Sequence, residues 1–259
     1  MSENAGRQSL EIERKYEVAA DLPLPPDSAF AETGLTAASP ITYELSAVYF
    51  DTSDADLARR GLALRVRHGG SDAGWHLKER GASEVQELFW PLDDAMPDGV
   101  RAELRARIGG AADAVAPIAE LSTERTVVVL ADAAGAELVE LADDRVEAFD
   151  RVTGVARAWR EWEAELLPGA PRAALDLVEP VLRAAGAEPS LSVAKIARAT
   201  GRLVDAARRS GAEPERIAAL EALDASDRAA ADAASAEGAA AESPAGSAAA
   251  ERRTEGDAQ

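Results

Sequence analysis

The stretch Leu10-Glu11-Ile12-Glu13-Arg14-Lys15-Tyr16, near the start of the chain, alternates between charged and apolar side chains. Residues two apart in a β-strand share one face of the strand. Glu11, Glu13 and Lys15 are therefore expected on one face, and the apolar side chains on the other. This pattern predicts a strand over Leu10–Val18 whose charged face carries two acids and one base.

Further segments with the same two-residue period follow, bounded by turn residues such as Gly69-Gly70. The predicted strands are Thr42–Phe50, Leu62–His68, Trp75–Glu79, Val85–Leu92, Thr126–Ala131, Glu137–Leu141, Arg145–Asp150 and Arg157–Leu167. Helices are predicted at Ser53–Arg60, Asp98–Ile108, Pro171–Ala185 (kinked or split by Pro180) and Ser192–Leu203. Many consecutive strands with few helices between them predict an α+β fold built on a closed or nearly closed antiparallel barrel.

The charged faces of these strands are sorted by sign. They carry Arg65 and Arg67 on one strand, His76 and Lys78 on the next, and Glu161, Glu163 and Glu165 on the last. Two like charges ~4–6 Å apart repel by ~3–4 kcal/mol at an effective dielectric constant near 20 unless a cation lies between them. A barrel enclosing both sets would let the acids bind a metal and the bases bind a polyanion. A solvent-exposed sheet face gives the same alternation, so this alternative stays open for each strand taken singly.

The amino-acid composition limits the partners, the compartment and the metal ligands that can be expected. The 259 residues carry a net charge of −19, which disfavours nucleic acid and acidic membranes as partners. No apolar stretch approaches the ~20 residues that cross a bilayer, and Met1–Ser9 has no signal-peptide pattern, so a cytoplasmic protein is expected. With no cysteine and only His68 and His76, a metal would be held by carboxylates, which favours Mg²⁺, Mn²⁺ or Ca²⁺. The sequence leaves the oligomeric state open.

Only three of the 28 basic residues are lysines: Lys15, Lys78 and Lys195. In a chain that otherwise uses arginine, a lysine can mark a position that needs a compact ammonium group. The composition changes after residue 204, because residues 205–259 hold 12 acids and six arginines among runs of Ala, Ser and Gly. We expect one folded domain over residues 8–204 and a largely disordered, low-complexity tail over 205–259, with at most a loose helix over Ala206–Ala234.

Several motifs resemble the CYTH, or triphosphate tunnel, family, which includes class IV adenylyl cyclases, thiamine triphosphatases and inorganic triphosphatases. Glu11, Glu13 and Lys15 resemble its N-terminal Glu-x-Glu-x-Lys signature. Further similar motifs follow in the family's order: Tyr49-Phe50-Asp51-Thr52, Leu62-Ala63-Leu64-Arg65-Val66-Arg67, Trp75-His76-Leu77-Lys78, Arg125, Asp144, Glu161-Trp162-Glu163-Ala164-Glu165-Leu166 and Val193-Ala194-Lys195-Ile196. The resemblance covers roughly residues 9–203. It departs from the family at Val85-Gln86-Glu87, which lacks the usual strand-five arginine, and at Ala194, which replaces a serine.

The resemblance implies an eight-stranded closed barrel, or tunnel, with a triphosphate inside. Phosphate-binding residues would be Arg65, Arg67, Lys78, Arg125 and Lys195. Ligands of Mg²⁺ or Mn²⁺ would be Glu11, Glu13, Asp144 and one or two of Glu161, Glu163 and Glu165. Lys15 would act among the catalytic carboxylates Glu11 and Glu13, orienting them or contacting phosphate.

The leading expectation from this resemblance is metal-dependent hydrolysis of inorganic triphosphate or a small organic triphosphate. Two alternatives remain. An adenylyl cyclase would need the same metal and phosphate groups together with an adenine pocket. A non-catalytic module that binds polyphosphate or nucleotide is favoured by the missing arginine near Val85.

Overall fold

The computed structural model describes residues 6–81 and 84–241. Its strands are β1 (Arg7–Glu11), β2 (Glu13–Glu17), β3 (Thr36–Ala37), β4 (Ile41–Asp51), β5 (Leu62–His68), β6 (Gly74–Arg80), β7 (Val85–Pro91), β8 (Ala116–Ala131), β9 (Glu137–Asp150), β10 (Val155–Leu166) and β11 (Glu188–Pro189). Its α-helices are α1 (Asp98–Ile108), α2 (Ala173–Ala185), α3 (Lys195–Ala199), α4 (Arg202–Arg209) and α5 (Pro214–Ala241). Short 3₁₀ helices cover Asp27–Thr33, Ala58–Arg60 and Gly109–Ala114.

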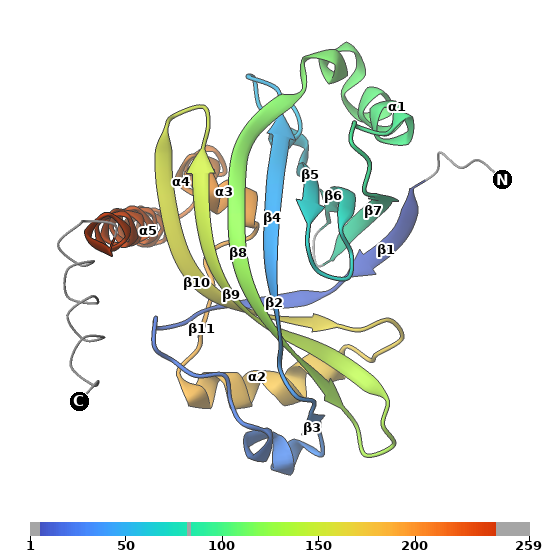
Figure 1. Ribbon diagram of the computed structural model, residues 1–259, viewed down its shortest axis with the longest axis vertical. Coiled ribbons are helices and arrows are strands. Elements are labelled where there is room, and N and C mark those ends of the chain that lie inside the picture. The colour runs from blue at the N-terminus through green and yellow to red at the C-terminus, as the bar shows by residue number, and fades with distance from the viewer. Residues whose placement is uncertain (1–5, 82–83, 242–259) are drawn as a thin grey trace, which may run out of the picture.

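The strands form one curved, antiparallel sheet in the order β1-β7-β6-β5-β4-β8-β9-β10-β2-β11, with β3 beside β8 (Figure 1). The sheet has eleven strands and is not closed, so the expected eight-stranded closed barrel is not confirmed. The predicted strand Leu10–Val18 is interrupted at Ile12. Its first part pairs with β7 and its second part with β10, so consecutive segments of the chain lie at distant places in the sheet order.

Apolar side chains fill the outer side of the sheet, as the alternation predicts. Trp162, Ala164 and Leu166 of β10 pack against α2 in one core cluster. Leu64 of β5 and Leu77 of β6 pack with residues of α1 in a second cluster. The two helices cover separate parts of the sheet (Figure 1). The opposite faces of the same strands are thereby left to the charged residues.

Several element boundaries differ from the prediction. Strand β8 begins at Ala116 rather than Thr126, and the two segments predicted around residue 143 form the single strand β9. The expected helix Ser53–Arg60 is reduced to one 3₁₀ turn, and the expected helix Ser192–Leu203 is divided into α3 and α4 at Gly201, which has a φ of 65°. Pro180 does not split α2, because it lies on the exposed side, where water can satisfy the freed carbonyl.

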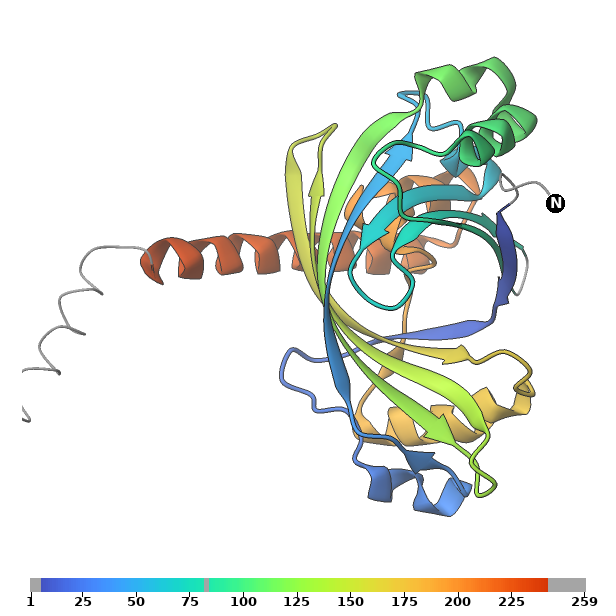
Figure 2. The same ribbon diagram turned by 45° about the vertical axis from the view of Figure 1, so that its right-hand side comes forward.

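The C-terminal region is more ordered than its composition suggested. Helix α4 crosses residue 204, and α5 runs for 28 residues and packs against β10 before it leads away from the sheet (Figure 2). The structure therefore has helices up to residue 241, over and beyond the loose helix expected at Ala206–Ala234. The rest of the expected disordered tail, 242–259, lies outside the described residues. Among the residues described, no helix has the length and apolar character needed to span a membrane.

Candidate functional site

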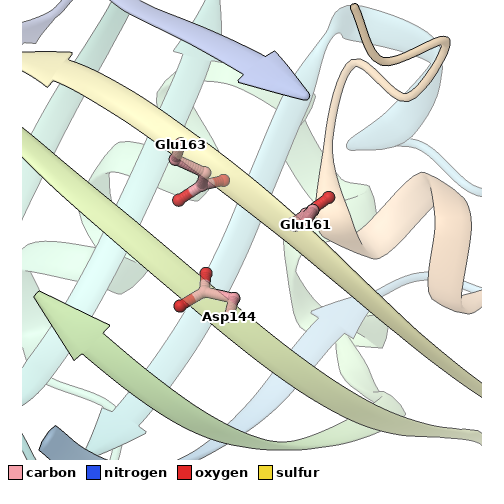
Figure 3. Close-up of side chains that lie close together, drawn as sticks. All are labelled: Asp144, Glu161 and Glu163. Atoms are coloured by element: carbon pink, nitrogen blue, oxygen red, sulfur yellow. The ribbon is translucent and has the colours of Figure 1, made fainter. Parts of the chain in front are cut away.

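Three buried carboxylates meet on the charged side of the sheet. Asp144 of β9 lies directly opposite Glu161 of β10 in the strand register, and Glu163 follows two residues later on the same face. One carboxylate oxygen from each residue lies within 4.8 Å of the others (Figure 3). We call Asp144, Glu161 and Glu163 the acidic cluster. Its all-oxygen donor set is the kind that Mg²⁺, Mn²⁺ and Ca²⁺ prefer.

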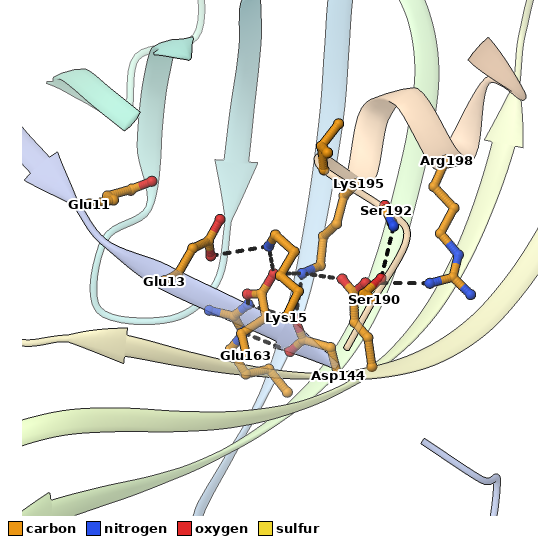
Figure 4. A network of polar contacts seen from close by, with 12 residues as sticks. Glu11, Glu13, Lys15, Asp144, Glu163, Ser190, Ser192, Lys195 and Arg198 are labelled. Carbon is orange, nitrogen blue, oxygen red and sulfur yellow. Dashed lines mark hydrogen bonds and ion pairs between the residues drawn. The ribbon is translucent and has the colours of Figure 1, made fainter. Parts of the chain in front are cut away.

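Three cationic side chains balance the acidic cluster. Arg125 of β8 donates two hydrogen bonds to Asp144, at 2.7 and 2.6 Å, and a third to Glu163 at 2.7 Å. The Nζ atom of Lys195, at the start of α3, lies 2.8 Å from Asp144, 2.6 Å from Glu161 and 2.6 Å from Glu163. Lys15 of β2 pairs with Glu163 and, at 3.1 Å, with Glu13 (Figure 4).

Burial and pairing oppose each other in setting the pKa values of this cluster. Burial alone would lower the pKa of Lys195, but the carboxylates of Asp144, Glu161 and Glu163 raise it well above its ordinary value. Burial would raise the pKa of Glu163, yet Lys15, Lys195 and Arg125 hold it well below the ordinary range. Glu163 and Lys195 are therefore ionised together at neutral pH.

Glu161 is the least satisfied member of the cluster. Its side chain is fully buried, and neither carboxylate oxygen has a partner in hydrogen-bond geometry. Its charge is compensated by ion pairs, with Lys195 at 2.6 Å from one oxygen and Arg198 at 3.6 Å from the other. A buried carboxylate with unfilled acceptor positions is suited to accept a cation.

A second group of acids lies along the N-terminal strands. Glu11 of β1 accepts hydrogen bonds from Lys78 of β6 at 2.8 and 2.6 Å. Burial, together with repulsion from Glu11, Glu13 and Glu163, raises the pKa of Glu165 to about 8. The acids predicted as one metal site thus form two neighbouring groups, and Lys15 connects them through Glu13 and Glu163.

Arg65 and Arg67, two of the predicted phosphate-binding residues, have guanidinium groups with unused hydrogen-bond donors. We call this pair the basic wall. Arg65 of β5 donates to the Tyr49 hydroxyl at 3.3 Å, and Arg67 pairs with Asp72. The Nε atoms of both arginines are buried without a hydrogen-bond partner. Burial and repulsion from Arg65 and Arg125 lower the pKa of Arg67 to about 9. Closely placed cations with free donors form a favourable site for an anion with several oxygens.

His76 and Glu87, which lie beside the basic wall, had no assigned role in the sequence prediction. His76 is buried, with Nδ1 2.8 Å from Glu87 and Nε2 3.0 Å from the carbonyl oxygen of Asp72. Glu87 also lies 3.6 Å from Lys78. The sequence alternation placed His76 and Lys78 on the same inward face. Their contacts with Glu87 depend on the register of β6 against β7, which only the structure shows.

The predicted site residues therefore lie on one side of the sheet, but several of the predicted phosphate-binding cations are paired with carboxylates. Arg125, expected to bind phosphate, is already bonded to two members of the acidic cluster. Lys78 is paired with Glu11, and Lys195 with the acidic cluster. Asp51 of the Tyr49–Thr52 motif instead accepts backbone hydrogen bonds from Thr52, Leu57 and Ala58, which fixes the turn after β4. The functional roles assigned from the sequence remain predictions.

Comparison with known proteins extends the resemblance to the whole fold. Uncharacterized proteins from two strains of Mycobacterium tuberculosis are each 38% identical in an alignment of 208 positions that covers 74% of this chain and 40% of theirs. The chain thus spans about two fifths of the length of these relatives.

A solved structure shows a similar fold at low sequence identity. A proposed adenylate cyclase from Bacillus halodurans has a TM-score of 0.52 and 19% identity, over 74% of this chain and 97% of its own. A proposed adenylyl cyclase from Hippeastrum with a dominant triphosphatase activity has a TM-score of 0.43 and 20% identity, over 80% of this chain and 98% of its own. The sequence pattern of the CYTH domain matches residues 9–200. This chain belongs to the CYTH domain family.

Proposed function

We propose that the chain hydrolyses inorganic triphosphate or a small organic triphosphate with the help of Mg²⁺ or Mn²⁺. The observation that supports this best is the close placement of two complementary groups on one side of the sheet. One is the acidic cluster, with the unsatisfied oxygens of Glu161. The other is the pair Arg65 and Arg67, whose buried Nε donors lack partners. A metal–triphosphate complex is a ligand that satisfies both.

In this proposal the acidic cluster holds the metal, together with Glu11 or Glu13 of the neighbouring group. A divalent metal held by these carboxylates would supply Lewis-acid chemistry, lowering the pKa of a water and neutralising charge on the phosphates. Arg65 and Arg67 bind phosphate oxygens through their planar donors, and Lys78 contributes a point charge. Water attacks the terminal phosphorus, the bond to the bridging oxygen breaks, and orthophosphate is released.

The ion pairs of the acidic cluster are suited to an exchange of partners, in which a metal replaces the cationic side chains on the carboxylates. Lys15, Lys195 and Arg125 now neutralise the carboxylates of the acidic cluster. A cation held by those carboxylates would take over part of that role and leave the ammonium groups free to contact phosphate. Cationic groups held in place before the substrate arrives contribute to catalysis because they need little reorganisation.

The test is a screen for phosphate release with Mg²⁺ or Mn²⁺ over tripolyphosphate, thiamine triphosphate, ATP and pyrophosphate, with cyclic AMP measured in parallel. We expect orthophosphate from at least one triphosphate, abolished by Glu13→Gln and weakened through substrate binding by Arg65→Ala. Cyclic AMP from ATP without orthophosphate would identify a cyclase instead. Tight, metal-dependent binding without turnover would identify a binding module, and wild-type activity in both variants would refute the proposed site.

A further inference from the structure

Arg198 of α3 lies between the acidic cluster and helix α5. Its side chain is 3% exposed and stacks over the Trp159 ring, 4.9 Å from the ring centre. Nε and Nη2 donate to Asp227 of α5 at 2.8 and 3.0 Å. Nη1 donates to Glu17 of β2 at 2.9 Å and forms a longer ion pair with Glu161 at 3.6 Å. One guanidinium therefore pairs with three carboxylates but donates hydrogen bonds to only two of them.

The carboxylate that Arg198 meets only in this longer ion pair belongs to the acidic cluster. Glu161 has no partner in hydrogen-bond geometry although it is fully buried. A shift of less than about 1 Å would bring Nη1 within the normal hydrogen-bond range of Glu161. Asp227 and Glu17 hold the guanidinium by hydrogen bonds from two other directions.

We propose that Asp227, with Glu17, is a positioning residue that holds Arg198 back from a close hydrogen bond to Glu161 and so leaves Glu161 available to a divalent cation. The inference rests on the proposed metal site and adds a role for α5, which lies beyond residues 9–200 that match the CYTH domain. Removal of the Asp227 charge frees Arg198 to move from 3.6 Å into hydrogen-bond contact with Glu161. A second cation in close contact with Glu161, beside Lys195, then competes with the metal.

The chain offers a matched control on the same helix. Asp224 lies three residues before Asp227 and accepts a hydrogen bond from the buried Arg157 of β10 at 2.7 Å. This contact also fastens α5 to the sheet, but Arg157 has no ion pair with the acidic cluster among the described residues. Asp224→Asn therefore removes the same kind of contact and the same charge without releasing Arg198.

The experiment measures binding of Mn²⁺ alone to the full chain by electron paramagnetic resonance of the free ion. Loss of a contact that orients a metal ligand typically weakens binding about 10- to 100-fold, and we expect a loss of this order for Asp227→Asn. Glu17→Gln should act in the same direction and is the milder variant should Asp227→Asn fail to fold, because Glu17 is partly exposed. Asp224→Asn should stay within about threefold of wild type, as should Arg198→Gln combined with Asp227→Asn.

Equal affinities for Asp227→Asn and Asp224→Asn would overturn the inference, as would a double variant as weak as Asp227→Asn. Absence of Mn²⁺ binding in the wild type would instead overturn the proposed function. In that case crystal structures of the wild type and Asp227→Asn still decide the inference. Movement of Arg198 onto Glu161 in the variant would support it, and an unmoved Arg198 would refute it.

Discussion

Asp143 and Asp144 are neighbours in β9, yet their carboxylates accept hydrogen bonds on opposite faces of the sheet. Asp144 faces the acidic cluster and is bonded to Arg125 at 2.6 and 2.7 Å. Asp143 is bonded to Arg160 at 2.7 Å through both oxygens. Arg160 also donates to the carbonyl groups of Ala19, Ala20 and Leu22. Two adjacent acids in buried arginine pairs therefore serve different parts of the molecule.

This relationship gives a matched pair of variants. Asp144→Asn should weaken Mn²⁺ binding at least about tenfold, equivalent to about 1.4 kcal/mol, because a carboxylate of the acidic cluster is lost. Asp143→Asn should leave Mn²⁺ affinity unchanged but lower the free energy of unfolding by about 3–5 kcal/mol, since Arg160 loses its buried partner. Isothermal titration and urea unfolding measure the two effects. Similar Mn²⁺ affinities in both variants would contradict the assignment of Asp144.

Anion binding by the arginine pair can be tested without turnover. Tripolyphosphate should raise the melting temperature of the wild type, because a ligand at 100 times its dissociation constant stabilises a protein by about 2.7 kcal/mol. Arg65→Gln and Arg67→Gln should lose most of this shift, since they remove the buried donors. Arg105→Gln is the control, because Arg105 is exposed on α1 and pairs only with Asp113 among the described residues. An equal loss in the control would show that general charge is responsible.

The raised pKa of Glu165 predicts that the stability of the metal-free protein depends on pH. Its pKa is raised from 4.5 to about 8, so the folded protein holds a proton that the unfolded chain releases at neutral pH. Stability from this group is therefore present at low pH and falls as pH rises from about 5 to about 8. Urea unfolding in EDTA at pH 6 and pH 8 should show this fall in the wild type and a smaller one in Glu165→Gln. Glu137→Gln, on an exposed position of β9, should retain the wild-type slope.

Helix α5 should contribute to the stability of the sheet. A chain that ends at Ser210 loses Asp224 and Asp227, which pair with the buried Arg157 and Arg198. We expect its free energy of unfolding to fall by at least about 3 kcal/mol, because a buried charge without its partner is costly. A chain that ends at Ala241 keeps the helix and is the control. Equal stability of the two truncated chains would contradict this prediction and favour a folded domain that ends near residue 204.

The sequence was most informative where the signal is local. Alternation in β5, β6 and β10 assigned the inward faces of Arg65, Lys78 and Glu163 correctly, because a strand's period of two needs only neighbouring residues. The interruption at Ile12 has no such signal, since it depends on β1 and β2 pairing with different strands. The run of strands predicted a closed or nearly closed barrel and the resemblance implied eight strands, whereas the sheet has eleven strands and is not closed.

The contribution of α5 could not be predicted because its contacts with β10 and α3 depend on buried ion pairs. Leu220 packs in a small cluster with residues of α4, and Asp224 and Asp227 pair with Arg157 and Arg198. Both acids occur in an Ala- and Asp-rich stretch that resembles low-complexity sequence. Their partners are separated from them by 67 and 29 residues, and only the folded chain brings these charges together.

The pairing of β2 with β10 has a consequence for the order in which the protein is made. Lys15 and Glu163 are 148 residues apart, so β2 cannot gain this partner until β10 has been synthesised. Contacts between distant parts of a chain slow folding. During synthesis, the segment with the two N-terminal glutamates therefore remains accessible to chaperones and proteases until most of the domain has emerged.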